Sequence, residues 1–302
     1  MSRDAAIASA KPEEPTSRAQ AIAQVAAYLV ESGVERTQAQ DDARAMLRAA
    51  ASLTRLQLAM EPQAPITDEE ADRLSRYAAR RAAREPVSRI LGERGFWTLD
   101  LVVAPNVLDP RAETETLVET TLALIENRDA PLEILDLGSG SGAILCALLS
   151  ELPRARGVAV DLSPDACAAT SANLARCGLA NRARIVRGRW GESLAGRYDA
   201  IVSNPPYVRA GEIPALDPEV RLYDPALALD GGPDGLDCYR EIVADLPRLL
   251  KSDGIVAFEV GSDQAVGVAA LLGDKGFGVA RVGRDAGGHE RVVAARPAPG
   301  RS

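Results

Sequence analysis

Histidine, cysteine and aromatic residues are scarce in this chain of 302 residues. No two of the four cysteines, Cys146, Cys167, Cys177 and Cys238, form a C-x-x-C pair, so we expect neither a disulfide framework nor a zinc site. We interpret them as reduced thiols of a cytoplasmic protein. The one histidine, His289, lies in a Gly-Gly-His-Glu turn, which predicts a solvated side chain rather than a catalytic base. The sequence therefore predicts chemistry without a metal.

Long apolar runs and an excess of positive charge are also missing. No window is apolar and uncharged over the length of a membrane span, and residues 1–16 lack the apolar region of a secretory signal. We expect those residues to be a flexible tail and the protein to have no membrane partner. The formal net charge of −8 argues against broad nucleic-acid binding but leaves room for a local basic patch. The length suggests two domains or one large one.

Residues 17–94 have the pattern of a small helical domain that docks the substrate. Ser17 is a candidate N-cap and Gly33 a candidate stop for the first helix. Thr67 and Glu70 form a capping-box pattern at the start of a later helix. An all-α domain is therefore expected at the amino-terminal end of the chain.

Seven arginines crowd the end of this helical domain. A solvated helix face would explain them, and a docking surface for a partner protein is the functional alternative. They are Arg73, Arg76, Arg80, Arg81, Arg84, Arg89 and Arg94.

Residues 95–112 are expected to form a hairpin or extended linker, because polar and apolar residues alternate and prolines follow. A helix should begin at Glu113, and with it a domain over residues 113–302. From residue 131 onward strands and helices alternate, which predicts an open, mostly parallel α/β sheet. Two last strand-like runs indicate a closing hairpin, and Pro247 should interrupt or kink the helix before them.

A glycine-rich turn lies between the first strand of this sheet and the next helix. It reads "LDLGSGSG" and comprises Gly138, Ser139, Gly140, Ser141 and Gly142. The spacing is neither the dinucleotide fingerprint nor a phosphate loop, which would need Gly-Lys-Ser/Thr.

The second strand ends about twenty residues later in Asp161, where a carboxylate can accept hydrogen bonds from ribose hydroxyls. An acidic residue at this position suits NAD as well as S-adenosylmethionine. The alternative without a function is an ordinary turn that happens to contain an aspartate. Together the two motifs predict a nucleoside cofactor.

A third strand ends in a rigid corner, "YDAIVSNPPYV". Pro205 and Pro206 remove backbone donors and end the strand, with Asn204 at the tip and Tyr207 beyond. A rigid turn without a function is the alternative interpretation.

"LDLGSGSG", "VD" and "NPPY", in this order, resemble the class I S-adenosylmethionine-dependent methyltransferases that modify amide or amino nitrogens. The runs "EPVSRILGERGFWTLDLVVAPNVLDPRAETETLVE" and "YDPALALDGGPDGLDCYREI" are similar to the protein-(glutamine-N5) methyltransferases that act on peptide-chain release factors. The resemblance extends from about residue 20 to "GGHERVVAARP". It implies a class I methyltransferase Rossmann-like sheet, with a closing antiparallel hairpin.

The same resemblance implies the reaction. S-adenosyl-L-methionine would donate a methyl group, leaving S-adenosyl-L-homocysteine, to the side-chain amide nitrogen (N5) of the glutamine in the release factor's Gly-Gly-Gln motif. Residues Asn204, Pro205, Pro206 and Tyr207 would hold that glutamine, with the Asn204 side-chain oxygen and the Pro205 carbonyl accepting its two N–H groups. Asn204 also belongs to the cofactor site, with Gly138–Gly142 and Asp161.

Further positions carry over from the family. Trp190 would flank the adenine, Asp136 would order the glycine loop, and Arg111 and Glu115 in "PRAETE" would cover the cofactor and substrate channel. Arg189 stands where the family usually has Asp, which leaves the usual contact to the adenine amino group open. Turn and N-cap roles are the alternatives for Asp136 and for the "PRAETE" acids.

Three other functions compete with this one. A ribosomal-protein glutamine N5-methyltransferase shares nearly every motif. An adenine-N6 nucleic-acid methyltransferase could use the same corner, but would want a basic groove. A cofactor-binding module without catalysis would leave the intact corner unexplained. We expect a monomer with no direct nucleic-acid partner.

Overall fold

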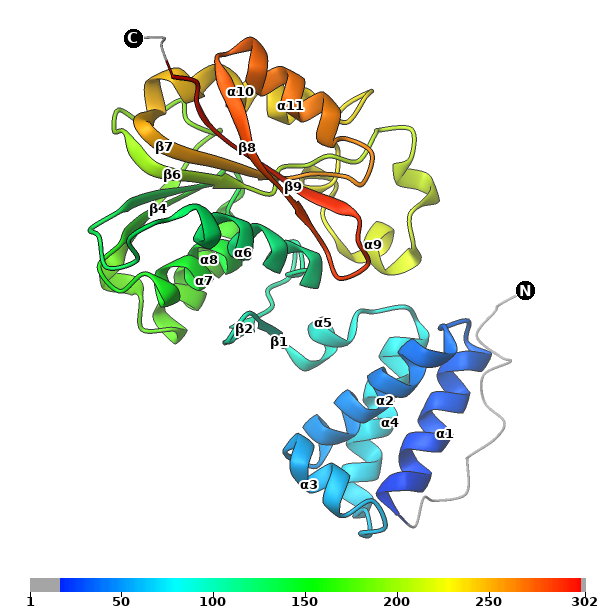
Figure 1. The fold of residues 1–302 in the computed structure, drawn as a ribbon. Helices are drawn as coiled ribbons and strands as arrows, with labels where there is room; N and C mark the ends of the chain where they lie inside the picture. Colours follow the sequence, from blue (N-terminus) through cyan, green and yellow to red (C-terminus); the bar gives the residue numbers. More distant parts are fainter. Residues whose placement is uncertain (1–16, 300–302) are drawn as a thin grey trace. The chain divides into compact units, whose positions relative to one another are not determined.

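The computed structural model describes residues 17–299, and the predicted tail at 1–16 lies outside them. The chain divides into two compact units between Leu91 and Gly92 (Figure 1). This division falls close to the predicted end of the helical domain at residue 94. The finer boundaries of the predicted linker, at 95 and 112, stay predictions.

From Ser17 onward the first unit is helical, as the periodicity predicts. Ser17 caps its first helix by accepting a hydrogen bond from the Gln20 amide, and Thr67 and Glu70 form the predicted capping box. The buried faces of the helices pack around Leu29 and Met46. The helices are α1 (Arg18–Glu31), α2 (Arg36–Ala50), α3 (Arg55–Met60), α4 (Asp68–Ala82) and α5 (Val87–Leu91).

The arginine-rich stretch of this unit is not one solvated face. Arg81 is 4% exposed and its Nε donates to Asp42 Oδ2 at 2.6 Å, which joins α4 to α2. Arg84 donates to the carbonyl of Gly33 at 2.6 Å. Arg80 pairs with Glu85 and also donates to the Ile90 carbonyl. All three arginines therefore make contacts within the helical unit, and Arg81 is buried away from any partner, whereas the Arg80 side chain is 45% exposed. The predicted docking surface stays a prediction.

The second unit opens with a small antiparallel hairpin and then forms the large sheet. Its strands are β1 (Glu93–Phe96), β2 (Leu99–Val102), β3 (Glu133–Leu137), β4 (Arg156–Asp161), β5 (Ala183–Arg187), β6 (Tyr198–Ser203), β7 (Leu250–Glu259), β8 (Phe277–Arg284) and β9 (Glu290–Pro297). Its α-helices are α6 (Glu115–Leu124), α7 (Ala143–Glu151), α8 (Pro164–Arg176), α9 (Pro218–Tyr223), α10 (Asp237–Leu249) and α11 (Ala265–Asp274). Short 3₁₀ turns are η2 (Ala112–Thr114), η3 (Ala180–Arg182), η4 (Ile213–Ala215) and η5 (Ala226–Ala228).

Seven strands form the large sheet in the order β5-β4-β3-β6-β7-β9-β8. The first five are parallel, whereas β9 runs antiparallel to β7 and to β8, which is the predicted closing hairpin. The chain moves outward from β3 to β5 and then returns to place β6 on the other side of β3. Open α/β sheets bind ligands at such a reversal, at the carboxyl ends of the strands.

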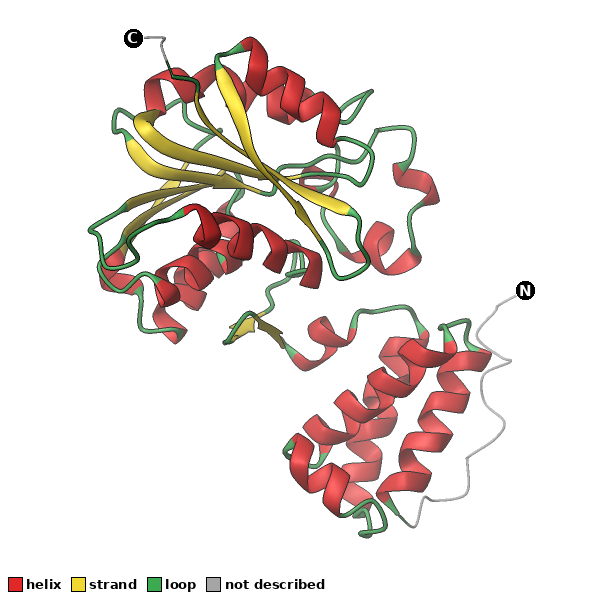
Figure 2. Cartoon of the chain, in the orientation of Figure 1, coloured by secondary structure: helices red, strands yellow, loops and turns green. Residues whose placement is uncertain are grey.

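Helices cover both faces of this sheet (Figure 2). Ile134 faces a core shared with α6, α7 and α8, whereas Leu135 and Leu137 face a core shared with α10 and α11. Two buried faces explain why the strands are almost continuously apolar. The class I methyltransferase architecture predicted from the sequence is confirmed.

Two local predictions differ from the structure. Helix α6 begins at Glu115, because the 3₁₀ turn η2 occupies the preceding residues, including Glu113. Pro247 lies within α10, which continues to Leu249, so the predicted interruption is wrong and the predicted kink stays a prediction. Pro247 has no amide hydrogen to donate to the Val243 carbonyl, so α10 lacks one helical hydrogen bond there, and the buried apolar face of the helix outweighs that loss.

Candidate active site

Strand register brings three predicted motifs to one edge of the sheet. Leu137 of β3 pairs with Val160 of β4 on one side and with Ser203 of β6 on the other. The residues that follow each of these are Gly138, Asp161 and Asn204. The Ser203 hydroxyl donates to the Leu137 carbonyl at 2.6 Å, which fixes the two central strands where they end. The predicted cofactor and substrate motifs are therefore neighbours.

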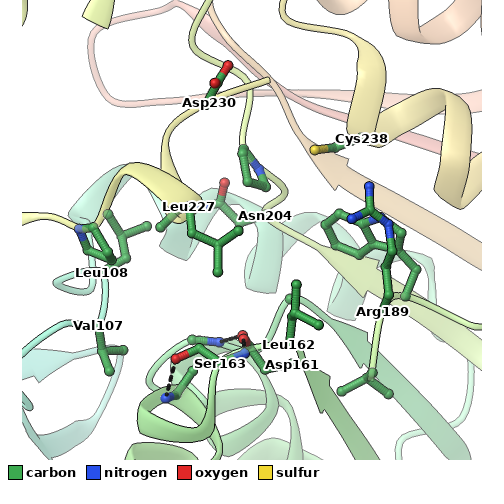
Figure 3. A pocket seen from close by; sticks show the side chains of 18 of the residues that line it. Val107, Leu108, Asp161, Leu162, Ser163, Arg189, Asn204, Leu227, Asp230 and Cys238 are labelled. Atoms are coloured by element: carbon green, nitrogen blue, oxygen red, sulfur yellow. Dashed lines mark hydrogen bonds between the residues drawn. The ribbon is translucent and has the colours of Figure 1, made fainter. Parts of the chain in front are cut away.

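A cavity of about 230 Å³ opens at this edge. Figure 3 shows Val107 and Leu108 on one side of it, Arg189 on the other and Asp161 beneath. Of the residues predicted for the site, those that line the cavity are Gly138, Gly140, Asp161, Arg189, Trp190, Asn204 and Pro206. Those outside its lining are Asp136, Ser139, Ser141, Gly142, Arg111, Glu115, Pro205 and Tyr207.

The three glycines of the loop meet different neighbours. All have a positive φ, +71° at Gly138, +54° at Gly140 and +77° at Gly142, a conformation that favours glycine. A Cβ added at Gly138 would lie 3.2 Å from the Trp190 ring, and one at Gly142 would lie 2.9 Å from Thr170 of α8. A Cβ at Gly140 would meet nothing within 4 Å. Gly140 is thus the point where a ligand can approach the backbone of the loop.

The serines of the loop stabilise it from behind. The Ser139 hydroxyl is hydrogen-bonded to Thr170 Oγ1 at 3.1 Å, and the Ser141 carbonyl accepts from the Asn173 side chain at 2.9 Å. Both serines are buried. The Ser139 side chain and the Ser141 backbone are thus both tied to α8, and neither serine lines the cavity.

Two carboxylates lie under the glycine loop. Asp161 accepts from the Gly140 amide and from the Ser163 amide, both at 2.8 Å. Burial raises the pKa of Asp161, and these amides oppose the shift. Asp136 is fully buried one layer deeper, where burial and then the charge of Asp161 raise its pKa to about 7. Asp161 borders the cavity, whereas Asp136 can act on it only through the loop.

Trp190 and Arg189 form one wall of the cavity. The Trp190 backbone has a left-handed φ of 44°, which places the indole against Gly138. Glu241 of α10 accepts from the Trp190 indole at 2.7 Å and from two nitrogens of Arg189 at 2.9 and 2.7 Å. A guanidinium has no acceptor atom, so Arg189 cannot receive the hydrogen bond from an adenine amino group that an Asp would.

The corner after β6 is held by the chain that follows it. The Val208 amide donates to the Leu229 carbonyl at 2.9 Å, and the Gly231 amide donates back to the Val208 carbonyl at 2.8 Å. Gln264, which is 5% exposed, donates to the Tyr207 carbonyl at 2.9 Å. Burial raises the pKa of Tyr207 to about 12, so its hydroxyl stays protonated at neutral pH. The corner is rigid because the segment 208–236 and Gln264, the N-cap residue of α11, both support its backbone.

Comparisons with known proteins agree with this geometry. Family models described as PrmC N-terminal domain and Methyltransferase small domain match residues 20–92 and 108–216. A release factor glutamine methyltransferase of Agrobacterium fabrum is 43% identical over 84% of this chain and 89% of its own length. One from Rhodospirillum rubrum is 48% identical over 76% and 70% of the two chains.

The chain belongs to the release factor glutamine methyltransferase family. The predicted family and class of enzyme are confirmed, and the protein is a methyltransferase. Among solved structures, the catalytic domain of hMettl16 in complex with the MAT2A 3'UTR hairpin 6 has a TM-score of 0.53 over 76% of this chain and 82% of its own, with 15% identity. At that identity the likeness concerns the fold alone.

The "PRAETE" stretch of this chain ties the site to its surroundings. Arg111 donates to Asp224 at 2.5 Å, and the Asp224 carboxylate is completely buried. This pair joins the stretch to the segment 208–236, part of which lines the cavity. Glu115 accepts from the Trp97 amide at 2.8 Å and thereby holds the turn of the β1–β2 hairpin. Both residues support the site from outside the cavity, and their predicted roles toward ligands stay predictions.

Several residues at the site were not predicted as such. Asn106, Val107 and Leu108 line the cavity, as do Pro225, Leu227, Ala228, Asp230 and Cys238. Both groups lie in the family-like runs "APNVLDPRAETE" and "YDPALALDGGPDGLDCYREI", so the resemblance contained the signal. The sequence around Glu259, at the end of β7, did not mark it as a site residue, because an acidic residue after an apolar run is common at the end of a strand.

Proposed function

We propose that this protein transfers the methyl group of S-adenosyl-L-methionine to the side-chain amide nitrogen of the glutamine in the Gly-Gly-Gln motif of peptide-chain release factors. The observation that carries the proposal is the position of Asn204, at the edge of the cavity beside the glycine loop. The names of the relatives, at more than 40% identity, support the release factor as the substrate over a ribosomal protein or a nucleic acid.

The cavity suits a nucleoside with a charged tail. Gly140 leaves open space at the loop, Trp190 offers an apolar ring and Asp161 a carboxylate able to accept from ribose hydroxyls. We infer that these residues would hold S-adenosylmethionine, with the methionine end toward Asn204.

None of the helices among residues 17–299 has the length and hydropathy needed to cross a bilayer.

The chemistry demands orientation more than acid–base catalysis. When bound, S-adenosylmethionine would supply an electrophilic methyl group. An amide nitrogen is a weak nucleophile, because its lone pair is delocalised into the carbonyl. The Asn204 Oδ1 atom and the Pro205 carbonyl can accept its two N–H groups, which orients the nitrogen and stabilises the positive charge that develops on it. The rigid corner holds both acceptors in place before the substrate arrives.

Labelled S-adenosylmethionine tests the proposal directly. The wild-type protein is incubated separately with release factor, ribosomes and nucleic acid, and the label is located by mass spectrometry. Label on the Gly-Gly-Gln glutamine is the expected result, whereas label only on a ribosomal protein or on a base would overturn it. We expect Asn204→Ala to lower the rate by about 10²–10³-fold while cofactor binding persists, by analogy with loss of an oxyanion-hole group. Asn181→Ala, at an exposed asparagine of η3, is the control.

A further inference from the structure

Glu259, the last residue of β7, is an unusual group to find behind a catalytic corner. Glu259 is only 2% exposed, and its Oε2 atom has no hydrogen-bond partner among the described residues. A buried carboxylate with an unsatisfied oxygen destabilises a fold, so its presence calls for a reason beyond packing.

The carboxylate of Glu259 faces the asparagine of the corner. Phe258 of β7 pairs with Ser203 of β6, so Glu259 and Asn204 follow at adjacent positions. The Thr114 and Asn204 side chains both lie close enough to the Glu259 carboxylate to lower its pKa. Asn204 Nδ2 also lies 3.3 Å from Thr114 Oγ1, to which it donates. Thr114 itself is buried in η2, directly before α6. Three residues from separate parts of the chain thus form one network behind the cavity.

This network determines which way the Asn204 amide points. An ionised carboxylate can only accept hydrogen bonds, so the NH₂ group of Asn204 must face Glu259 and Thr114. The Oδ1 atom then points to the other side, toward the cavity that Asn204 lines. If the amide turned by 180°, its NH₂ group would face the N–H groups of the substrate, and Oδ1 would face the carboxylate.

We propose that Glu259, together with Thr114, is a positioning residue for methyl transfer, which holds the Asn204 amide so that Oδ1 is presented to the substrate glutamine. The inference rests on the proposed function, because it assigns a role toward the same substrate amide. Glu259 itself does not line the cavity.

Protonation of Glu259 would weaken the preference for this orientation of the Asn204 amide, since a carboxylic acid can also donate a hydrogen bond. Burial raises the pKa of Glu259 to about 7. The charged and titratable groups that act on it are Glu113 of η2, which raises the pKa, Arg291 of β9, which lowers it, and Tyr207 and Tyr239, whose hydroxyls are protonated at neutral pH. The competent form is the ionised one, so activity should rise with pH through about 7.

The test compares Glu259→Gln with wild type on intact release factor. The glutamine keeps the size of the side chain but can turn its own NH₂ group toward Asn204. We expect kcat to fall by about 10- to 100-fold, as for a misplaced catalytic group, while KM for the release factor and Kd for S-adenosylmethionine change by less than about twofold. The thermal midpoint at pH 8 should stay the same or rise, because a buried charge has been removed. The rise of kcat with pH should disappear.

A second pair of variants protects the test against misfolding. Thr114→Ser keeps the hydroxyl and should retain activity, whereas Thr114→Val should lower kcat as Glu259→Gln does. Asp199→Asn is the control, since Asp199 lies at the opposite end of β6 from Asn204 and pairs with Lys251. It should alter stability without altering kcat.

The outcomes separate this inference from the proposed function. Wild-type protein that leaves the release factor unlabelled refutes the proposed function. An active wild type with a Glu259→Gln variant of equal kcat and the same pH profile refutes the positioning role. A loss of kcat accompanied by equal losses of cofactor affinity and thermal midpoint also refutes it, because that pattern belongs to a merely structural residue.

Discussion

Gly231 does not line the cavity, but it lies against the backbone of the Asn-Pro-Pro-Tyr corner. A substitution there should displace the corner without changing any residue that lines the cavity. A Cβ added there would lie 2.8 Å from the Pro206 carbonyl oxygen and 2.8 Å from Tyr207 Cα. Carbon atoms in contact sit about 3.5 Å apart or more, so one backbone must give way by roughly 0.7 Å. The neighbouring atoms are backbone rather than a flexible side chain, so the displacement falls on the corner itself. Gly231→Ala should therefore shift the acceptors that would orient the substrate amide.

The expected effects can be scaled from that displacement. Overpacking of this kind destabilises by about 1–3 kcal/mol, and a misplacement approaching 1 Å costs about 10²-fold in rate. We expect kcat for the release factor to fall by about 10- to 100-fold, with cofactor affinity close to wild type, because the glycine loop follows β3 and is not among the groups that the added Cβ would meet. Initial rates with labelled S-adenosylmethionine, calorimetry of cofactor binding and a thermal melt measure the three quantities.

Gly211→Ala is the matched control for this substitution. Gly211 lies in the same segment, and a Cβ there would meet nothing within 4 Å. Its kcat and thermal midpoint should equal those of wild type. If Gly231→Ala proves as active as Gly211→Ala, the corner tolerates displacement, and the argument from preorganised acceptors is wrong.

Three further predictions concern charged groups. Asp161→Ala should weaken S-adenosylmethionine binding by about 1.5–3 kcal/mol, or about 10- to 150-fold in Kd by calorimetry, and unchanged affinity would remove Asp161 from the site. The pKa of Asp136 is raised from 3.8 to about 7, so the folded state retains a proton there that the unfolded state loses, and the free energy of unfolding falls as pH rises through that window. Asp136→Asn should reduce that fall in chemical denaturation series between pH 4 and 7, and an identical pH dependence would contradict the assignment. Arg81→Met should cost the helical unit about 3–5 kcal/mol, because Asp42 stays buried without its cation, whereas Arg76→Met at an exposed position of α4 should be nearly neutral in the same melt.

The local pattern of the sequence determined the elements and the family. Caps such as Ser17 and Thr67, the apolar strands and the proline corner all act through neighbours in the chain, and the structure has them where the pattern indicates. The motifs around Gly138, Asp161 and Asn204 also predicted one site, because parallel strands end at a common edge. Such features can be read locally since their physical causes are local.

Only the tertiary structure decided what the isolated charges do. Arg81 looked like part of a charged surface, but its partner Asp42 lies on another helix, far away in the sequence. Glu259 is likewise distant in sequence from Asn204 and Thr114, and the three meet only because β7 lies beside β6 and η2 precedes the helix packed on them. A side chain's charge is visible in the sequence, but its burial and its partners depend on how the strands and helices pack.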